Sequence, residues 1–198
     1  IKDAEFLAPR LEEPRLVFDR DANKIGIVIE GRVGPTVKVE VDAGKVDVGK
    51  GTRTRLLPVV REGTLDYAAI IEGERRLKTH FQELGYFFAN VTSVCSVEPP
   101  LADSESATIA NDSSFLCSVL NGSDLVDKSV TIKYVASLNR KLNLVRMTVR
   151  GTNALNIEDV RSILETQEAN LLGIIPLFGY GRGYTSLGTL EADAATIA

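Results

Sequence analysis

The sequence is poor in the residues that most often carry chemistry: its 198 residues include one histidine, two cysteines, one methionine and no tryptophan. A single histidine, His80, excludes a multi-histidine metal site, and two cysteines cannot complete a structural zinc site alone. Lys and Arg number 23 against 27 Asp and Glu, so the basic surplus typical of nucleic-acid binders is missing. We therefore expect no metal, no cofactor and no nucleic acid as ligand.

Long hydrophobic runs are also missing. The longest strongly apolar stretch, residues 171–178, contains Pro176 and is far shorter than the roughly 20 residues that a helix needs to cross a bilayer. The chain begins at Ile1 without a methionine or a signal-like segment, and we expect it to be a piece of a longer protein. Hydrophobic residues make up 44% of the chain, as in ordinary globular domains.

Alternation of apolar and polar residues, typical of strands with one buried face, fills much of the chain. Ile25, Ile27 and Ile29 form one such run, and a polar turn separates it from the apolar residues before it. This pattern predicts a hairpin over residues 15–33. Runs of the same kind predict further strands at 36–42, 86–97, 130–134 and 145–149.

Helical spacing replaces this alternation in between. An apolar face predicts a long helix over residues 66–84, and Gly85 stands where a left-handed C-cap is expected. Glu74 interrupts that face, which we expect to be partly exposed there. Shorter helices are expected at 53–57, after the N-cap Asn156, and in the tail from Thr185.

The order of these elements repeats along the chain, which predicts consecutive strand–helix–helix–strand–strand units. Residues 35–140 form one complete unit, with a loop-rich insertion at 98–128. Residues 1–34 are expected to be the C-terminal hairpin of a preceding unit, and 141–198 the truncated start of a following one. The predicted fold class is α+β: tandem βααββ units, each a small mixed three-stranded sheet with two helices packed on one face.

Three motifs at the joints of these units carry a resemblance to a known family. Ile29-Glu30-Gly31 is similar to the ending of the last strand of a unit. Gly85-Tyr86 is similar to the turn after the second helix, and Gly151-Thr152-Asn153 to the opening of a unit. In this combination the sequence resembles the polypeptide-transport-associated (POTRA) domains of the BamA and surface-antigen family of outer-membrane proteins.

The resemblance implies a function without catalysis. POTRA domains form the periplasmic region of outer-membrane assembly proteins in Gram-negative bacteria. They bind nascent, unfolded outer-membrane polypeptides, or periplasmic and lipoprotein accessory subunits. A β-barrel in the outer membrane is expected to follow this segment in the same chain. Two-partner secretion and autotransporter-assembly transporters carry similar domains and stay open as alternatives.

The binding site that the resemblance implies is an exposed sheet edge, formed by the second strand of the complete unit. Such an edge accepts an extended peptide as an added strand, through backbone hydrogen bonds that depend little on sequence. The insertion at 98–128 either leaves this edge open or folds back over it. The residues expected to form the edge are Phe88, Ala89, Asn90, Val91, Thr92, Ser93 and Val94.

The two cysteines, Cys95 and Cys117, lie in the expected edge strand and in the insertion. In the oxidising periplasm that the resemblance implies, a disulfide between them would tie the insertion to the strand. Closing that loop would contribute about 3 kcal/mol in the chain-entropy model. Two buried, inert thiols are the alternative.

Two further motifs belong to other classes of protein. Residues 179–183 are rich in glycine and follow an apolar run, as in a phosphate-binding loop, but no Lys-Ser/Thr pair follows them. A nucleotide-binding or hydrolytic enzyme is therefore the alternative from another class, and the absence of a nucleophile–base pair disfavours it. Residues 19–23 with Glu30 imitate a calcium loop, but Lys24 stands where glycine is needed, so a hairpin turn is favoured.

Overall fold

The structure is a computed structural model that describes residues 6–100, 117–120, 125–148, 156–169 and 183–197. The chain forms two compact units. The first comprises Ile1–Asp42, Val46–Glu74 and Thr92–Val135, and the second comprises Ala43–Lys45, Arg75–Val91 and Ala136–Ala198. This division cuts across the predicted unit of 35–140. Its long helix, at 67–83, and its second strand in sequence, at 90–98, each contribute residues to both compact units.

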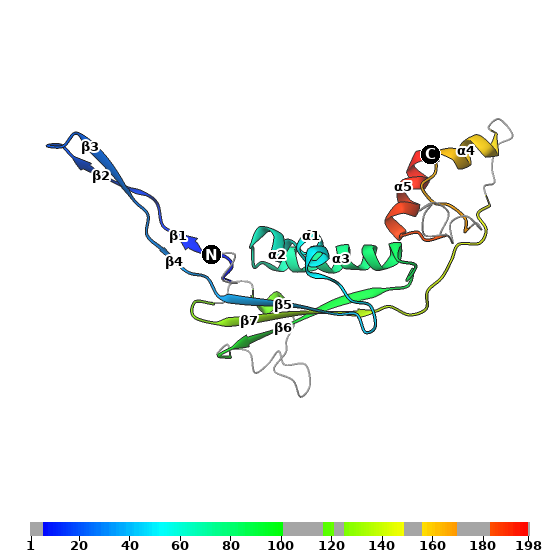
Figure 1. The fold of residues 1–198 in the computed structure, drawn as a ribbon, viewed down its shortest axis with the longest axis horizontal. Coiled ribbons are helices and arrows are strands. Elements are labelled where there is room, and N and C mark those ends of the chain that lie inside the picture. Colours follow the sequence, from blue (N-terminus) through cyan, green and yellow to red (C-terminus); the bar gives the residue numbers. More distant parts are fainter. Residues whose placement is uncertain (1–5, 101–116, 121–124, 149–155, 170–182, 198) are drawn as a thin grey trace. The chain divides into compact units, whose positions relative to one another are not determined.

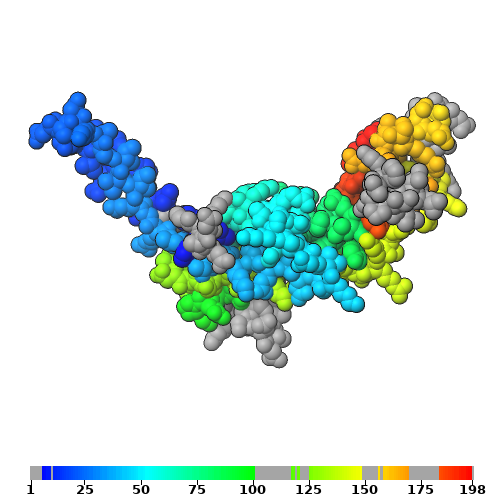
Figure 2. Space-filling model, in the orientation of Figure 1, coloured from blue at the N-terminus to red at the C-terminus, as the bar shows by residue number. Residues whose placement is uncertain are grey.

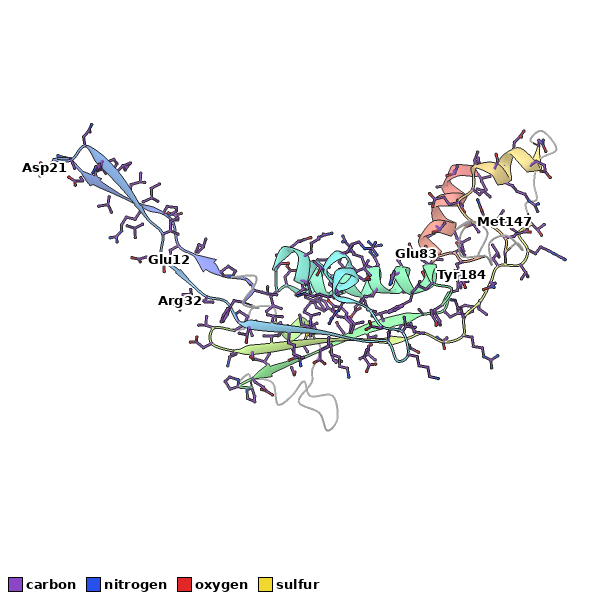
Figure 3. The ribbon with its side chains drawn as sticks, viewed as in Figure 1. Glu12, Asp21, Arg32, Glu83, Met147 and Tyr184 are labelled. Carbon is purple, nitrogen blue, oxygen red and sulfur yellow. A yellow bond between two sulfur atoms is a disulfide. The ribbon has the colours of Figure 1, made fainter. Side chains whose placement is uncertain are left out.

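The N-terminal part forms the predicted hairpin. Strands β2 (Arg15–Asp19) and β3 (Lys24–Val28) pair antiparallel, and the short strands β1 (Arg10–Leu11) and β4 (Gly31–Arg32) extend the pairing. The turn is closed by Asp19, whose Oδ1 accepts a hydrogen bond from the Ala22 N–H at 3.0 Å. The motif that imitates a calcium loop is thus a hairpin turn with Asp21 at its tip (Figure 3).

The largest of the three described sheets is a three-stranded mixed sheet (Figure 1). It consists of β5 (Thr36–Asp42), β7 (Ser129–Ser137) and β6 (Asn90–Glu98), in the order β5-β7-β6. Strands β5 and β7 run parallel, with Val39 opposite Ile132. Since the sheet is mixed, β6 runs antiparallel to β7.

Helices cover one face of this sheet: α1 (Lys50–Leu56), α2 (Pro58–Glu62) and α3 (Tyr67–Glu83) (Figure 1). Pro58 ends α1 and begins α2, which it suits because the first position of a helix needs no N–H. Figure 2 shows α1 and α2, in cyan, beside the light-blue strand β5. The element order and the sheet confirm the predicted fold class, α+β with helices on one face of a mixed three-stranded sheet.

The core of the first unit lies between the sheet and the helices. Burial raises the pKa of Tyr134, and the nearby carboxylate of Glu74 raises it further, so the phenol keeps its proton. The Tyr134 hydroxyl donates a hydrogen bond to the carbonyl of Ile70 on α3 at 3.3 Å. The side chains that are at most 1% exposed and form this core are Leu57, Val59, Ile70, Cys95, Val130, Ile132 and Tyr134.

The second unit contains the end of α3 and two further helices, α4 (Ile157–Ile163) and α5 (Leu187–Ile197). Asn156 caps α4 as predicted, by accepting a hydrogen bond from the Glu158 N–H at 3.1 Å. Asp193 of α5 accepts the N–H groups of Glu165 and Thr166 at 2.8 and 2.9 Å. Burial raises the pKa of Asp193, but these bonds outweigh that effect and hold the pKa below its usual value.

The predicted strand at 145–149 is wrong over the part that the structure describes, since residues 141–148 form neither helix nor strand. Val145 is 77% exposed. The Leu144 N–H donates to the Gly183 carbonyl at 2.7 Å, and the Met147 N–H donates to Glu168 Oε1 at 2.5 Å. Alternation marks a face that can be buried, but a strand also needs a neighbouring strand. Residues 149–155, with the motif residues Gly151 and Asn153, lie outside the described part.

Candidate functional site

Strand β6 lies at an edge of the sheet, with β7 as its neighbour in the sheet order β5-β7-β6. Of the seven residues predicted for the edge, Asn90 to Val94 belong to this strand. The strand continues to Glu98, four residues beyond the predicted segment. Its position leaves one side of the β6 backbone without a neighbour among the described strands.

The other two predicted residues, Phe88 and Ala89, precede the strand and lie in a turn. The Ala89 N–H donates to the Tyr86 carbonyl at 2.8 Å, which closes this turn. Gln82 at the end of α3 donates from Nε2 to the Phe87 carbonyl at 2.9 Å, and Asn139 donates from Nδ2 to the Phe88 carbonyl at 2.8 Å. Side chains therefore hydrogen-bond to backbone carbonyls that could otherwise pair with a neighbouring strand. This is why β6 begins after the apolar residues that precede it.

The side chains of β6 alternate between the two faces of the sheet. Val91, Ser93, Cys95 and Val97 are buried toward the helices, and Asn90 and Thr92 are exposed on the other face. The open face of β6 is thus mainly polar, and its helix side is apolar except at Ser93. A strand added at this edge would continue both faces.

Glu74 on α3 contacts β6 at its fourth residue. Its Oε1 atom accepts hydrogen bonds from the Ser93 N–H at 2.7 Å and from Ser93 Oγ at 2.6 Å. The sequence contained a signal for this contact, because Glu74 interrupts an otherwise apolar helix face. A carboxylate on such a face needs a donor from the element beneath it. The partner itself could not be inferred without the sheet.

A disulfide joins Cys95 of β6 to Cys117, with a Cα–Cα distance of 5.1 Å. Cys117 begins the short 3-10 helix η3 (Cys117–Leu120), and both cysteines are at most 2% exposed. The bond therefore fixes η3 to the edge strand. The remainder of the insertion at 101–116 and 121–124 lies outside the described residues.

The opposite edge of the sheet, β5, is partly occupied by the chain itself. Phe6 forms an antiparallel bridge with Thr36, and the Leu7 N–H donates to the Pro35 carbonyl at 3.1 Å. A Cβ atom on Gly34 would lie 1.7 Å from the Leu7 carbonyl oxygen, so only glycine permits this approach. At its first residue, β5 therefore already has a partner.

The turn motif Gly85-Tyr86 forms a separate cluster in the second unit. Gly85 has a φ of +97°, and a Cβ atom there would lie 2.8 Å from the Tyr184 ring and 2.9 Å from the Lys141 side chain. Lys141 Nζ lies 4.7 Å from the centroid of the Tyr184 ring (Figure 3 labels Tyr184). An apolar cavity of about 230 Å³ beside this cluster is lined by Phe87, Leu142, Leu144 and Leu190, among others.

The remaining segments and features that the sequence analysis considered are as follows in the described part of the chain. The glycine-rich segment at 179–182 lies outside it, and Gly183 follows with a φ of +68°. Within the described ranges, no three His, Cys, Asp or Glu side chains gather as they would around a metal ion. No helix in these ranges has the length and apolar composition to cross a membrane.

Two solved structures are similar to this chain. The crystal structure of Haemophilus influenzae BamA POTRA3-5 is 15% identical in sequence with a TM-score of 0.43, and the match covers 98% of this chain and 62% of that one. The N-terminal domain of Omp85 from the thermophilic cyanobacterium Thermosynechococcus elongatus is 11% identical with a TM-score of 0.28, covering 98% and 66%. The chain thus spans less than two thirds of each. No family model and no curated protein matches. The fold of this chain, α+β with helices on one face of a mixed three-stranded sheet, rests on the topology described above.

Proposed function

We propose that this chain is a polypeptide-binding part of an outer-membrane assembly protein and that it binds extended segments by strand addition at β6. The observation that carries the proposal is the position of β6 at the edge of the sheet, with β7 as its neighbour among the described strands. Backbone groups at such an edge bind chains of many sequences, which suits a protein that handles different unfolded clients.

Two further observations support the proposal. The motifs Ile29-Glu30-Gly31 and Gly85-Tyr86 resemble those of POTRA domains, and the first precedes β5 while the second follows α3. The disulfide between Cys95 and Cys117 suits an oxidising compartment and supports the proposed location in the periplasm. Unfolded outer-membrane polypeptides are the proposed clients, and accessory subunits are partners of the same region.

The test is an NMR titration of the isotopically labelled chain with an extended peptide of alternating apolar and polar residues. Strand addition is expected to shift the backbone amides of residues 90–94 in a concentration-dependent way. The control peptide has the same sequence with N-methyl groups on two consecutive central residues, which blocks pairing along both of its edges.

The control peptide is expected to leave the β6 amides in place. If it shifts them as strongly as the parent peptide, backbone pairing is not the mode of binding. If the parent peptide moves amides elsewhere and leaves residues 90–94 unchanged, β6 is not the binding edge.

A further inference from the structure

Glu74 reaches from helix α3 to the backbone of the edge strand in the middle of the proposed site. A backbone N–H that donates to a carboxylate forms a charge-assisted hydrogen bond, about twice as strong as a neutral one. Here the same oxygen also accepts the Ser93 hydroxyl, so two donors hold it, at 2.7 and 2.6 Å. Ser93 is only 8% exposed, which shields the pair from competing water.

The pleat of the strand fixes the direction of this N–H group. Backbone groups of successive residues in a strand point alternately to its two sides, and β7 occupies one side of β6. Since the Ser93 N–H donates to a helix side chain, it points to the side away from β7. An added strand would need this N–H as a donor at the centre of its ladder.

The disulfide adds a second contact to β6 two residues further along, on the face where the Cys95 side chain is buried. Backbone groups two residues apart point in the same direction, so those of Cys95 share the side of Ser93. Cys95 is bonded to Cys117, whose Cα lies 5.1 Å away, and this places η3 beside the C-terminal half of β6. Counted from Asn90, Ser93 is a position on the outer side of β6 at which a side chain already accepts the backbone N–H.

We infer that Glu74 blocks strand addition at the β6 edge, and we call its contact with Ser93 the guard. The carboxylate accepts the Ser93 N–H when no polypeptide is bound, and an added strand binds only by displacing the carboxylate. This inference rests on the proposed function, because it concerns regulation of the same edge. The guard weakens binding, and it also keeps an exposed edge from pairing with other chains at random, a known hazard of edge strands.

The experiment compares peptide affinity in three variants of the full chain. Glu74→Ala is expected to bind the extended peptide about tenfold tighter or more, because a hydrogen bond to a charged group no longer has to be broken. Ser93→Ala removes only the hydroxyl donor and is expected to give an intermediate increase. Glu83→Ala removes the same charge from an exposed position at the end of α3 (Figure 3) and is expected to leave the affinity unchanged.

A spectroscopic readout shows whether the guard itself has been removed. The Ser93 amide proton, bonded to a carboxylate in the wild type, is expected to move upfield in Glu74→Ala and to stay in place in Glu83→Ala. Where Glu74→Ala fails to fold, Glu74→Gln keeps a weaker, neutral acceptor and is expected to give a smaller gain in affinity.

The outcomes separate this inference from the proposed function. Equal affinity of the wild type and Glu74→Ala, with shifts at residues 90–94 in both, overturns the guard and leaves strand addition standing. Absence of binding by both proteins overturns both ideas. Tighter binding by Glu74→Ala with shifts outside β6 also rejects the guard, because the carboxylate would then act at another place.

Discussion

At the scale of single residues, Gly73 shows that close packing can require a glycine where helix propensity disfavours it. It lies inside α3, where glycine costs about 1 kcal/mol relative to alanine. A Cβ atom at this position would lie 2.6 Å from the Tyr134 hydroxyl and 3.1 Å from Leu57 Cδ2. The missing side chain therefore allows α3 to approach the sheet closely enough for Tyr134 to donate to Ile70.

We predict that Gly73→Ala lowers the free energy of unfolding, because overpacking of about 1–3 kcal/mol exceeds the gain in helix propensity. Urea denaturation measures the change. Gly51→Ala in α1 is the matched control: nothing lies within 4 Å of its added Cβ, so it is expected to leave stability unchanged or to raise it slightly. Equal effects of the two substitutions would mean that Tyr134 moves away from the added methyl group without lowering the free energy of unfolding.

At the scale of elements, the edge strand is held by contacts from outside the sheet. Glu74 ties β6 to α3, and the Cys95–Cys117 disulfide ties it to η3. An edge strand has hydrogen bonds to one neighbour only, so such contacts limit its fraying. The Glu74 contact also takes up one backbone N–H of the edge strand.

We predict that reduction of the disulfide lowers the free energy of unfolding by about 3 kcal/mol, the value expected for a bond that closes a loop over a sequence separation of 22 residues. Urea midpoints with and without reductant measure this. The double variant Cys95→Ala/Cys117→Ala is expected to match the reduced wild type and to be insensitive to reductant. An unchanged wild-type midpoint under verified reduction would show that packing alone holds η3 in place.

At the scale of the whole molecule, the sequence predicted which side of a strand is buried better than it predicted which strands pair with one another. The apolar positions of β6 and β7 alternate in the sequence, and the structure buries them as expected. The same kind of pattern at Val145 gave a wrong strand, because the described chain contains no partner strand for it. Periodicity is local information, and strand pairing depends on segments that lie far away in the chain.

The candidate site was predictable to the same extent. Alternation indicated the strand Asn90–Glu98. Its place at the sheet edge was inferred from the family resemblance, because no local sequence pattern specifies the strand order β5-β7-β6. The role of Glu74 could not be predicted, because its partner Ser93 is 19 residues away and on another element. The start of β6 was misplaced since Gln82 and Asn139 take the backbone carbonyls before it.

The hairpin at the N-terminal end differs from the three-stranded sheet in that its apolar side chains are exposed. Leu16 and Phe18 lie opposite Ile27 and Ile25, so these four side chains share one face of the hairpin, and each is more than half exposed. In the central sheet the equivalent kind of face is covered by helices. A two-stranded hairpin without such cover is marginally stable at best.

We therefore predict that two phenylalanines of this chain differ sharply in their contribution to stability. Phe81→Ala, at a fully buried position of α3, is expected to lower the free energy of unfolding by about 3–5 kcal/mol. Phe18→Ala, at a position that is 66% exposed, is expected to change it by about 0.5 kcal/mol or less. Urea denaturation followed by circular dichroism compares the two. A large loss in Phe18→Ala would show that the apolar face of the hairpin is packed in solution and that the hairpin unfolds together with the helix-covered sheet.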